Sequence, residues 1–130
     1  MIQGFSEQTE PLTPYEQEIL VPVLCRGLQS KVGKERAVTN KHIVACLKGK
    51  YQIGEARVRK IINHIRINGL VPCLMATSGG YYVATEEAEL KEYEDSLLGR
   101  EQAIRAVRMA ITRQREERYH GKELHIPFRH

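Results

Sequence analysis

Hydrophobic residues recur with helical spacing in three stretches of the first 70 positions, 19–28, 43–47 and 58–65. In the third stretch they stand at i, i+3, i+4 and i+7, a spacing that predicts one buried stripe along a helix. Pro22 falls inside the first stretch, where it is expected to kink the helix or divide it. The pattern therefore predicts three amphipathic helices.

Capping signals mark the ends of these helices. Thr13 and Glu16 have the spacing of a capping box at the start of the first helix. Thr39 and Asn40 are good N-caps for the second helix, which is expected to end near Gly49. The sequence Asn68-Gly69 ends the third. The short apolar segment 37–39 between the first two helices suits a single strand or an extended bridge.

After the third helix, two short apolar or aromatic runs flank Ser78-Gly79-Gly80, which predicts a β-hairpin. Pro72 indicates that the first strand begins just after it or has an unpaired edge. A long helix is then predicted over residues 86–119, capped by Thr85 and with a break available at Gly99. The fold class is therefore mainly α with a small β-hairpin (α+β), and a long C-terminal helix follows.

Length and composition indicate one small globular domain with an appendage. The chain has 130 residues, of which 42% are hydrophobic and 28% charged. It contains neither a run of about 18 apolar residues nor a signal-peptide pattern at its start, so no membrane association is expected. Three cysteines without paired spacing favour reduced thiols and a cytoplasmic location. Residues 1–12 and 120–130 are expected to be flexible.

The formal charge of +4 is distributed unevenly. Residues 26–66 contain eleven Lys and Arg residues against Glu35 and Glu55, whereas residues 86–95 contain six acids against Lys91. This segregation favours a middle segment that faces a polyanion. Charge alone leaves open the alternative that the lysines simply solvate helix surfaces.

The sequence predicts no enzyme, cofactor or metal site. It has no Gly-rich phosphate loop, no nucleophile elbow and no paired carboxylates in an apolar context. His42 and Cys46 have an i, i+4 spacing that can bind zinc, but no C-x-x-C pair accompanies them. Isolated cysteines among apolar residues are more often small core residues.

The order of helix, short strand, helix, tight turn, helix and hairpin over residues 13–85 resembles a winged helix-turn-helix domain. More specifically, the segment VRKIINHIRINGLVPCLMATSGGYYVAT is similar to small winged-helix proteins encoded by bacteriophages and their hosts. The resemblance implies that the third helix, residues 54–68, enters the major groove of duplex DNA. It also implies a role in phage or mobile-element replication or transcription.

The outward face of the third helix is expected around Arg57, Lys60, Asn63 and His64. Arg can pair with guanine, and Asn or Gln with adenine, whereas Lys suits phosphates. The hairpin turn has no basic residue, so its hydroxyls and the basic loop before the second helix would contact the DNA backbone. The full predicted DNA-binding set is Lys34, Arg36, Lys41, Gln52, Arg57, Arg59, Lys60, Asn63, His64, Arg66, Thr77 and Ser78.

The long helix carries a further signal. Leu97, Ile104 and Ile111 repeat every seven residues, Val107 lies between the last two, and Arg100 and Gln114 interrupt the seam. A core built from residues 13–85 would have difficulty covering all of them. We therefore expect a homodimer through this strip, or docking to a replication or transcription partner protein. The latter would suit a different class of function, a winged-helix scaffold for protein interaction.

Overall fold

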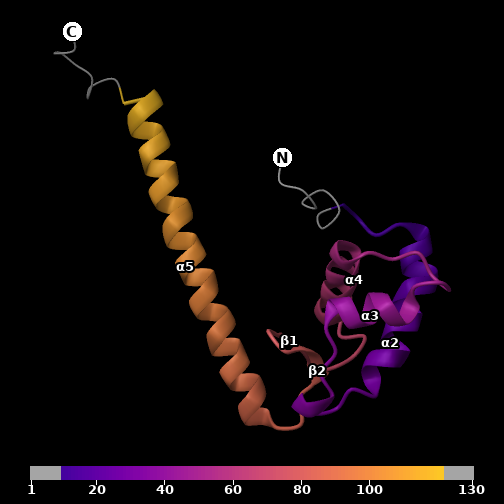
Figure 1. The fold of residues 1–130 in the computed structure, drawn as a ribbon. Helices are drawn as coiled ribbons and strands as arrows, with labels where there is room; N and C mark the ends of the chain where they lie inside the picture. The colour runs from indigo at the N-terminus through magenta and orange to yellow at the C-terminus, as the bar shows by residue number, and fades with distance from the viewer. Residues whose placement is uncertain (1–9, 122–130) are drawn as a thin grey trace. The chain divides into compact units, whose positions relative to one another are not determined.

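The structure, a computed structural model, describes residues 10–121 (Figure 1). Its elements in chain order are η1 (Glu16–Leu20), α2 (Val21–Gln29), η2 (Lys34–Arg36), α3 (Asn40–Leu47), α4 (Glu55–Ile67), β1 (Leu74–Thr77), β2 (Gly80–Val83) and α5 (Glu87–Tyr119). The prediction of a mainly α fold with one hairpin and a long last helix is confirmed. The chain divides into two compact units, residues 1–90 and 91–130. The segments expected to be flexible lie largely outside the described residues.

The first helix begins with the predicted capping box. The Thr13 amide donates to Oε1 of Glu16 at 2.8 Å, and the Glu16 amide donates to Oγ1 of Thr13 at 3.1 Å. The turn η1 that follows is π-helical, and the Val21 amide at its end donates to the Glu16 carbonyl. Pro22 stands at the start of α2, where its missing N–H is tolerated. Next to Pro22 the helix therefore changes from π-type to α-type hydrogen bonding and continues without a gap to Gln29, so it is not divided there.

The next two helices end and begin where the capping residues indicate. The Thr39 hydroxyl accepts from the His42 amide at 3.1 Å and caps α3. Gly49 follows α3 with φ 98°, and Gly69 follows α4 with φ 64°. Both angles lie in the left-handed region that glycine adopts without a steric penalty.

The hydrophobic core lies between α2, α3, α4 and the hairpin. The predicted stripe on α4 is confirmed, because all four of its members are fully buried: Val58, Ile61, Ile62 and Ile65. They pack with Leu20, Leu24 and Leu28 from the first helical segment, with Ile43 from α3 and with Leu74 and Tyr81 from the hairpin. Burial of this aliphatic stripe fixes which side of α4 faces outward.

The hairpin is antiparallel, with Thr77 opposite Gly80 at its turn. Val38 forms the predicted extended bridge beside β2: its amide donates to the Tyr81 carbonyl at 3.0 Å and its carbonyl accepts from the Tyr81 amide at 2.7 Å. Gly80 has φ 118°, and a Cβ atom there would lie 2.4 Å from the Val38 carbonyl oxygen. Only glycine therefore allows the Val38 backbone to come this close.

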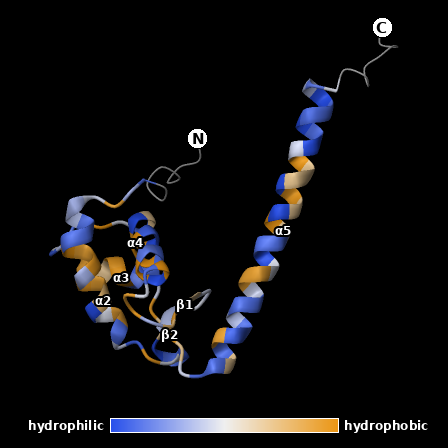
Figure 2. Cartoon of the chain, turned by 180° about the vertical axis from the view of Figure 1, so that it is seen from behind, coloured by the Kyte–Doolittle hydropathy of each residue, from blue (hydrophilic) through white to orange (hydrophobic). Residues whose placement is uncertain are grey.

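The last helix, α5, runs for 33 residues and continues through Gly99, so the break that was available there is not used. It has no buried residue. Along the helix, hydrophobic residues alternate with hydrophilic ones (Figure 2). No helix among the described residues combines the length and the apolar character needed to cross a membrane.

Candidate nucleic-acid interface

The side of α4 that faces away from the core is polar and basic. Lys60 and Asn63 stand opposite the buried stripe, and Arg59 lies on one flank. Asn63 and Arg59 are exposed, and Lys60 is half-buried. Ile67, on the same outer side, is 83% exposed. Side chains of these types can donate to phosphates or to base edges.

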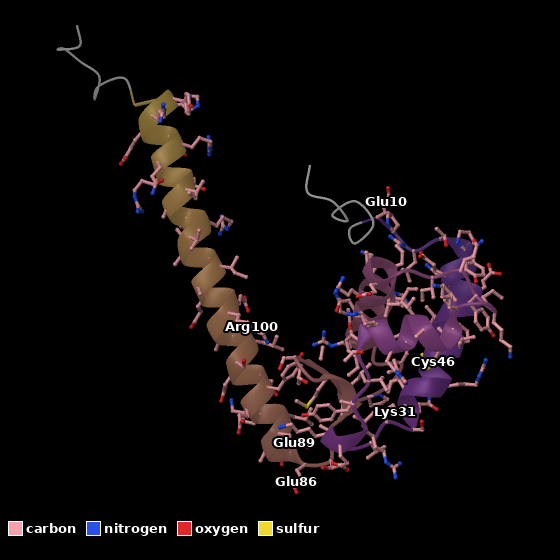
Figure 3. The ribbon with its side chains drawn as sticks, in the orientation of Figure 1. Glu10, Lys31, Cys46, Glu86, Glu89 and Arg100 are labelled. Carbon is pink, nitrogen blue, oxygen red and sulfur yellow. The ribbon has the colours of Figure 1, made fainter. Side chains whose placement is uncertain are left out.

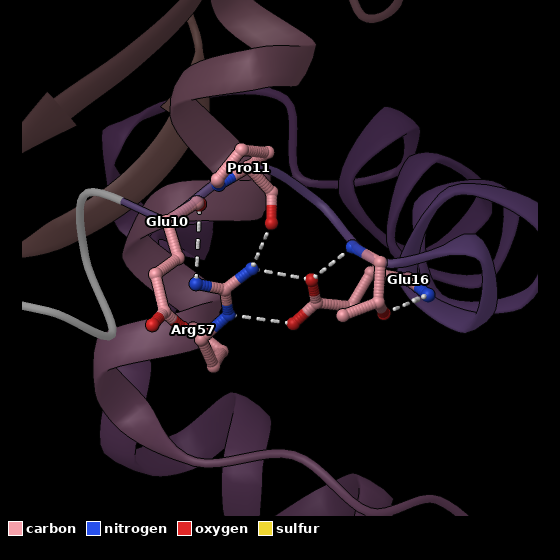
Figure 4. Close-up of polar contacts among 5 residues, drawn as sticks. Glu10, Pro11, Glu16 and Arg57 are labelled. Carbon is pink, nitrogen blue, oxygen red and sulfur yellow. Dashed lines mark hydrogen bonds and ion pairs between the residues drawn. The ribbon is translucent and has the colours of Figure 1, made fainter.

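Arg57 does not belong to this outer face, so the prediction that its side chain points outward is wrong. Its Nε donates to Oε2 of Glu16 at 2.6 Å and its Nη2 to Oε1 at 2.5 Å (Figure 4). The guanidinium also donates to the carbonyl oxygens of Glu10, at 3.3 Å, and Pro11, at 3.1 Å. Because every one of these acceptors precedes α2, Arg57 fastens the N-terminal segment to α4.

Burial and charge pairing both act on Glu16. Its side chain is 8% exposed and that of Arg57 is 15% exposed. The hydrogen bond from Arg57 lowers the pKa of the Glu16 carboxyl, and burial opposes this shift only in part. The capping box marked Glu16 in the sequence, but Arg57 lies 41 positions away and no local pattern connects the two.

Two local pairs of polar residues lie near the C-terminal end of α4. Nη1 of Arg66 donates to Oδ1 of Asn63 at 3.2 Å, which joins two predicted DNA contacts into one surface group. Nδ2 of Asn68 donates to the His64 carbonyl at 2.8 Å and lies 3.4 Å from Nδ1 of the His64 ring. These pairs orient Asn63 and His64 toward the C-terminal half of the helix.

The connection between α3 and α4 continues this surface. Gln52 is exposed, and its backbone N–H donates to the Tyr15 hydroxyl at 3.2 Å. A shallow polar hollow at this connection is lined by Tyr15, Gly49, Lys50, Tyr51 and Gln52. Lys41, in the first turn of α3, is also exposed. The connection before α4 therefore presents the exposed side chains of Lys50 and Gln52, both of which can donate hydrogen bonds.

Other predicted contacts lie on different elements. Lys34 and Arg36 are exposed on η2, which packs beside β2. In the hairpin turn, Ser78 is exposed, whereas the Thr77 hydroxyl accepts from the Gly79 amide at 3.2 Å and donates to the Gly80 carbonyl at 3.1 Å. Thr77 therefore stabilises the turn in the structure.

The candidate metal ligands of α3 form a pair without further ligands. Sγ of Cys46 lies 3.4 Å from Nε2 of His42, at the surface of the helix (Figure 3). Within residues 10–121, no three His, Cys, Asp or Glu side chains gather as a metal site would require. The contact is a weak hydrogen bond between neighbouring turns.

A second surface of interest lies on α5. Leu97, Ile104, Val107 and Ile111 are 40%, 69%, 63% and 56% exposed, respectively. Exposed apolar side chains of this size, repeated along one helix, are typical of an interaction surface. They belong to the second unit of the chain, whereas α4 belongs to the first.

Compared with known proteins, the chain matches no family model, and no curated protein or solved structure is significantly similar to it.

Proposed function

We propose that this protein is a non-enzymatic, duplex-DNA-binding protein of the winged helix-turn-helix type, with α4 in the major groove. The observation that supports it most is the outer face of α4, where Lys60 and Asn63 stand opposite a fully buried apolar stripe and Arg59 lies on its flank. The preceding helix α3 and a tight connection present that face to solvent. The element order along residues 13–85 agrees with this type of domain.

The proposed contact surface differs from the sequence-based one by two residues, Arg57 and Thr77. Thr77 is left out because its hydroxyl is bound within the hairpin turn. Arg57 is left out, because its guanidinium is bound to Glu16 and to two backbone carbonyls. Asn63 and Gln52 are the proposed base-reading residues, since amides pair with adenine. The proposed phosphate contacts are Lys41, Arg59, Lys60, His64 and Arg66, with Lys34, Arg36 and Ser78 on neighbouring elements.

The biological setting of the proposal comes from the resemblance to small phage and bacterial winged-helix proteins. We propose a cytoplasmic role in phage or mobile-element replication or transcription. Three free cysteines, two of them exposed, agree with a reducing compartment. We also propose that two copies associate through α5.

The proposal is tested by fluorescence-anisotropy titration of a mixed-sequence DNA duplex over a series of salt concentrations. Affinity should fall steeply with salt, because each phosphate contact releases counterions. Lys60→Ala should weaken binding and reduce the salt slope by about 1 if Lys60 contacts a phosphate. Lys91→Ala is the matched control: it removes the same charge from an exposed position of α5.

Equal effects of Lys60→Ala and Lys91→Ala would contradict the placement of α4 in the interface. Absence of binding to any duplex at about 50 mM salt, where phosphate contacts are strong, would contradict DNA binding altogether.

A second candidate function is a protein-interaction module in which the helices and hairpin serve as a scaffold. The exposed apolar strip on α5 favours it, because such a strip suits an apolar partner surface. Partner binding through this strip would persist at high salt, whereas binding to DNA would not.

A further inference from the structure

The apolar seam of α5 has the spacing of a two-helix interface. Leu97, Ile104 and Ile111 are seven residues apart, and Val107 occupies the intermediate position between the last two. All four side chains are at least 40% exposed. A helix of 33 residues without one buried side chain gains little stability from packing, and a second helix laid along the seam would supply such packing.

Charge changes sign along one flank of this seam. This flank contains Arg108, which directly follows Val107, and the residues at steps of seven from it. In chain order they are Glu87, Glu94, Glu101, Arg108 and Arg115. The first part of the helix, residues 87–95, contains five acids and one Lys. Residues 100–118 contain six Arg and three Glu. The two halves of α5 are therefore electrostatically complementary to each other.

We infer that α5 pairs with the α5 helix of a second copy in antiparallel orientation. This deepens the self-association named in the proposed function and does not depend on DNA binding. Flanking charges set the orientation of paired helices. In an antiparallel pair with Leu97 against Val107 of the second copy, Glu94 faces Arg108 and Glu87 faces Arg115 of that copy.

A parallel pair would oppose like charges instead. Arg100 stands in the seam, so two copies of Arg100 would face each other directly in a parallel pair. On the flank, Glu94 would face Glu89 of the second copy. The antiparallel register removes both conflicts, because Arg100 lies across from Ile104 of the second copy. Its one like-charge contact on this flank is Glu101 opposite Glu101 of that copy, at the centre of the pair. The methylene groups of Arg100 can cover Ile104 of the second copy, while its guanidinium reaches the Glu101 carboxylates at the centre of the pair.

The opposite flank of the seam also permits close packing. Its middle positions are Ser96, Ala103 and Ala110, all small residues that allow two helix backbones to approach, and its end positions are Glu89 and Glu117. In this arrangement the two chains enter the helix pair from opposite ends. The N-terminal ends of the two helices then lie about 40 Å apart along the pair, at 1.5 Å per residue.

The test uses three variants of the full chain: Glu94→Lys, Arg108→Glu and the combination of both. An antiparallel pair should be disrupted by either single change, because each places like charges together at two symmetry-related contacts. The combined variant exchanges the two signs, keeps the net charge of the unmodified protein and should dimerise as well as it does. Sedimentation velocity at micromolar concentration and low salt measures the dimer, and circular dichroism checks that α5 remains helical.

The expected result is a dimer for the unmodified chain and the combined variant, with dimerisation about tenfold weaker or more in each single variant. A mixture of the two single variants should form a heterodimer. A monomeric unmodified chain, or equal dimerisation of all three variants, would overturn the inference. Because no DNA is present, either result leaves the proposed DNA binding of α4 to be judged by the Lys60→Ala titration.

Discussion

The carboxylate of Glu16 binds the guanidinium of Arg57 through two hydrogen bonds and at the same time accepts one from the Thr13 amide. One buried acid therefore serves both the N-terminal cap of the first helix and the attachment of that helix to α4. This relationship removes Arg57 from the surface of α4. It also makes Arg57 important for stability, because removal of either partner leaves the other charge largely buried without it.

We predict that Arg57→Ala lowers the free energy of unfolding by about 3 kcal/mol, because it leaves a buried carboxylate without its charged partner. Urea denaturation measures the loss. Arg59→Ala is the control on the same helix: Arg59 is 45% exposed and lies 3.9 Å from Glu55, so its removal should cost less than about 1 kcal/mol. Equal losses for the two variants would mean that the Glu16 contact contributes little to stability.

The same pair predicts a pH dependence. Arg57 lowers the pKa of the Glu16 carboxyl below 4.5 in the folded state, so its contribution to stability is present above pH 4.5. That contribution is lost as the pH falls through the lowered pKa. The difference in unfolding free energy between the unmodified protein and Glu16→Gln should therefore be largest at neutral pH and shrink in acid. Denaturation of both proteins between pH 7 and pH 2 measures it.

Glu18→Gln is the control for this experiment, because Glu18 is exposed in the same turn and carries the same charge. A difference between the unmodified protein and Glu16→Gln that stays constant down to pH 2 would contradict a role for the ionised carboxylate.

The close approach of Gly80 to Val38 predicts that alanine is tolerated much less well at position 80 of the hairpin turn than at position 79. Gly80→Ala should destabilise the protein by about 2 kcal/mol or more, because it combines a positive φ with a clash against the Val38 carbonyl. Gly79→Ala should change stability by less than about 0.5 kcal/mol, since the nearest atom to its Cβ would be 3.8 Å away. Thermal or urea unfolding compares the two. Equal stability of the two variants would mean that the Val38–Tyr81 bridge can shift at little cost to make room for a methyl group at position 80.

The two sides of α4 differ so much in burial that mutation can test which side faces the core. Ile62 is fully buried and Ile67 is 83% exposed, although both lie on one helix. Ile62→Ala should cost about 2–5 kcal/mol through lost burial and a residual cavity. Ile67→Ala should stay within about 0.5 kcal/mol. If urea denaturation gave the reverse order, α4 would be rotated and its proposed DNA-facing side would be wrong as well.

The sequence by itself determined the features of this protein that depend on neighbouring residues or on a short period. The capping box at Thr13, the cap at Thr39 and the left-handed ends at Gly49 and Gly69 each involve contacts within about four positions. The buried stripe of α4 follows from the helical period, which places its four aliphatic residues on one side. The fold class and the outer positions of Lys60 and Asn63 could therefore be predicted.

Only the tertiary structure decided which side chains are bound by residues far away in the sequence. Arg57 lies beside the polar face of α4 in any helical projection, yet its partner Glu16 is 41 positions away. The approach of Gly80 to Val38 likewise joins distant segments. Such contacts depend on how the helices and the hairpin pack, because a polar side chain near the rim of a core turns toward the partner that packing brings to it. A local pattern contains no information about that partner.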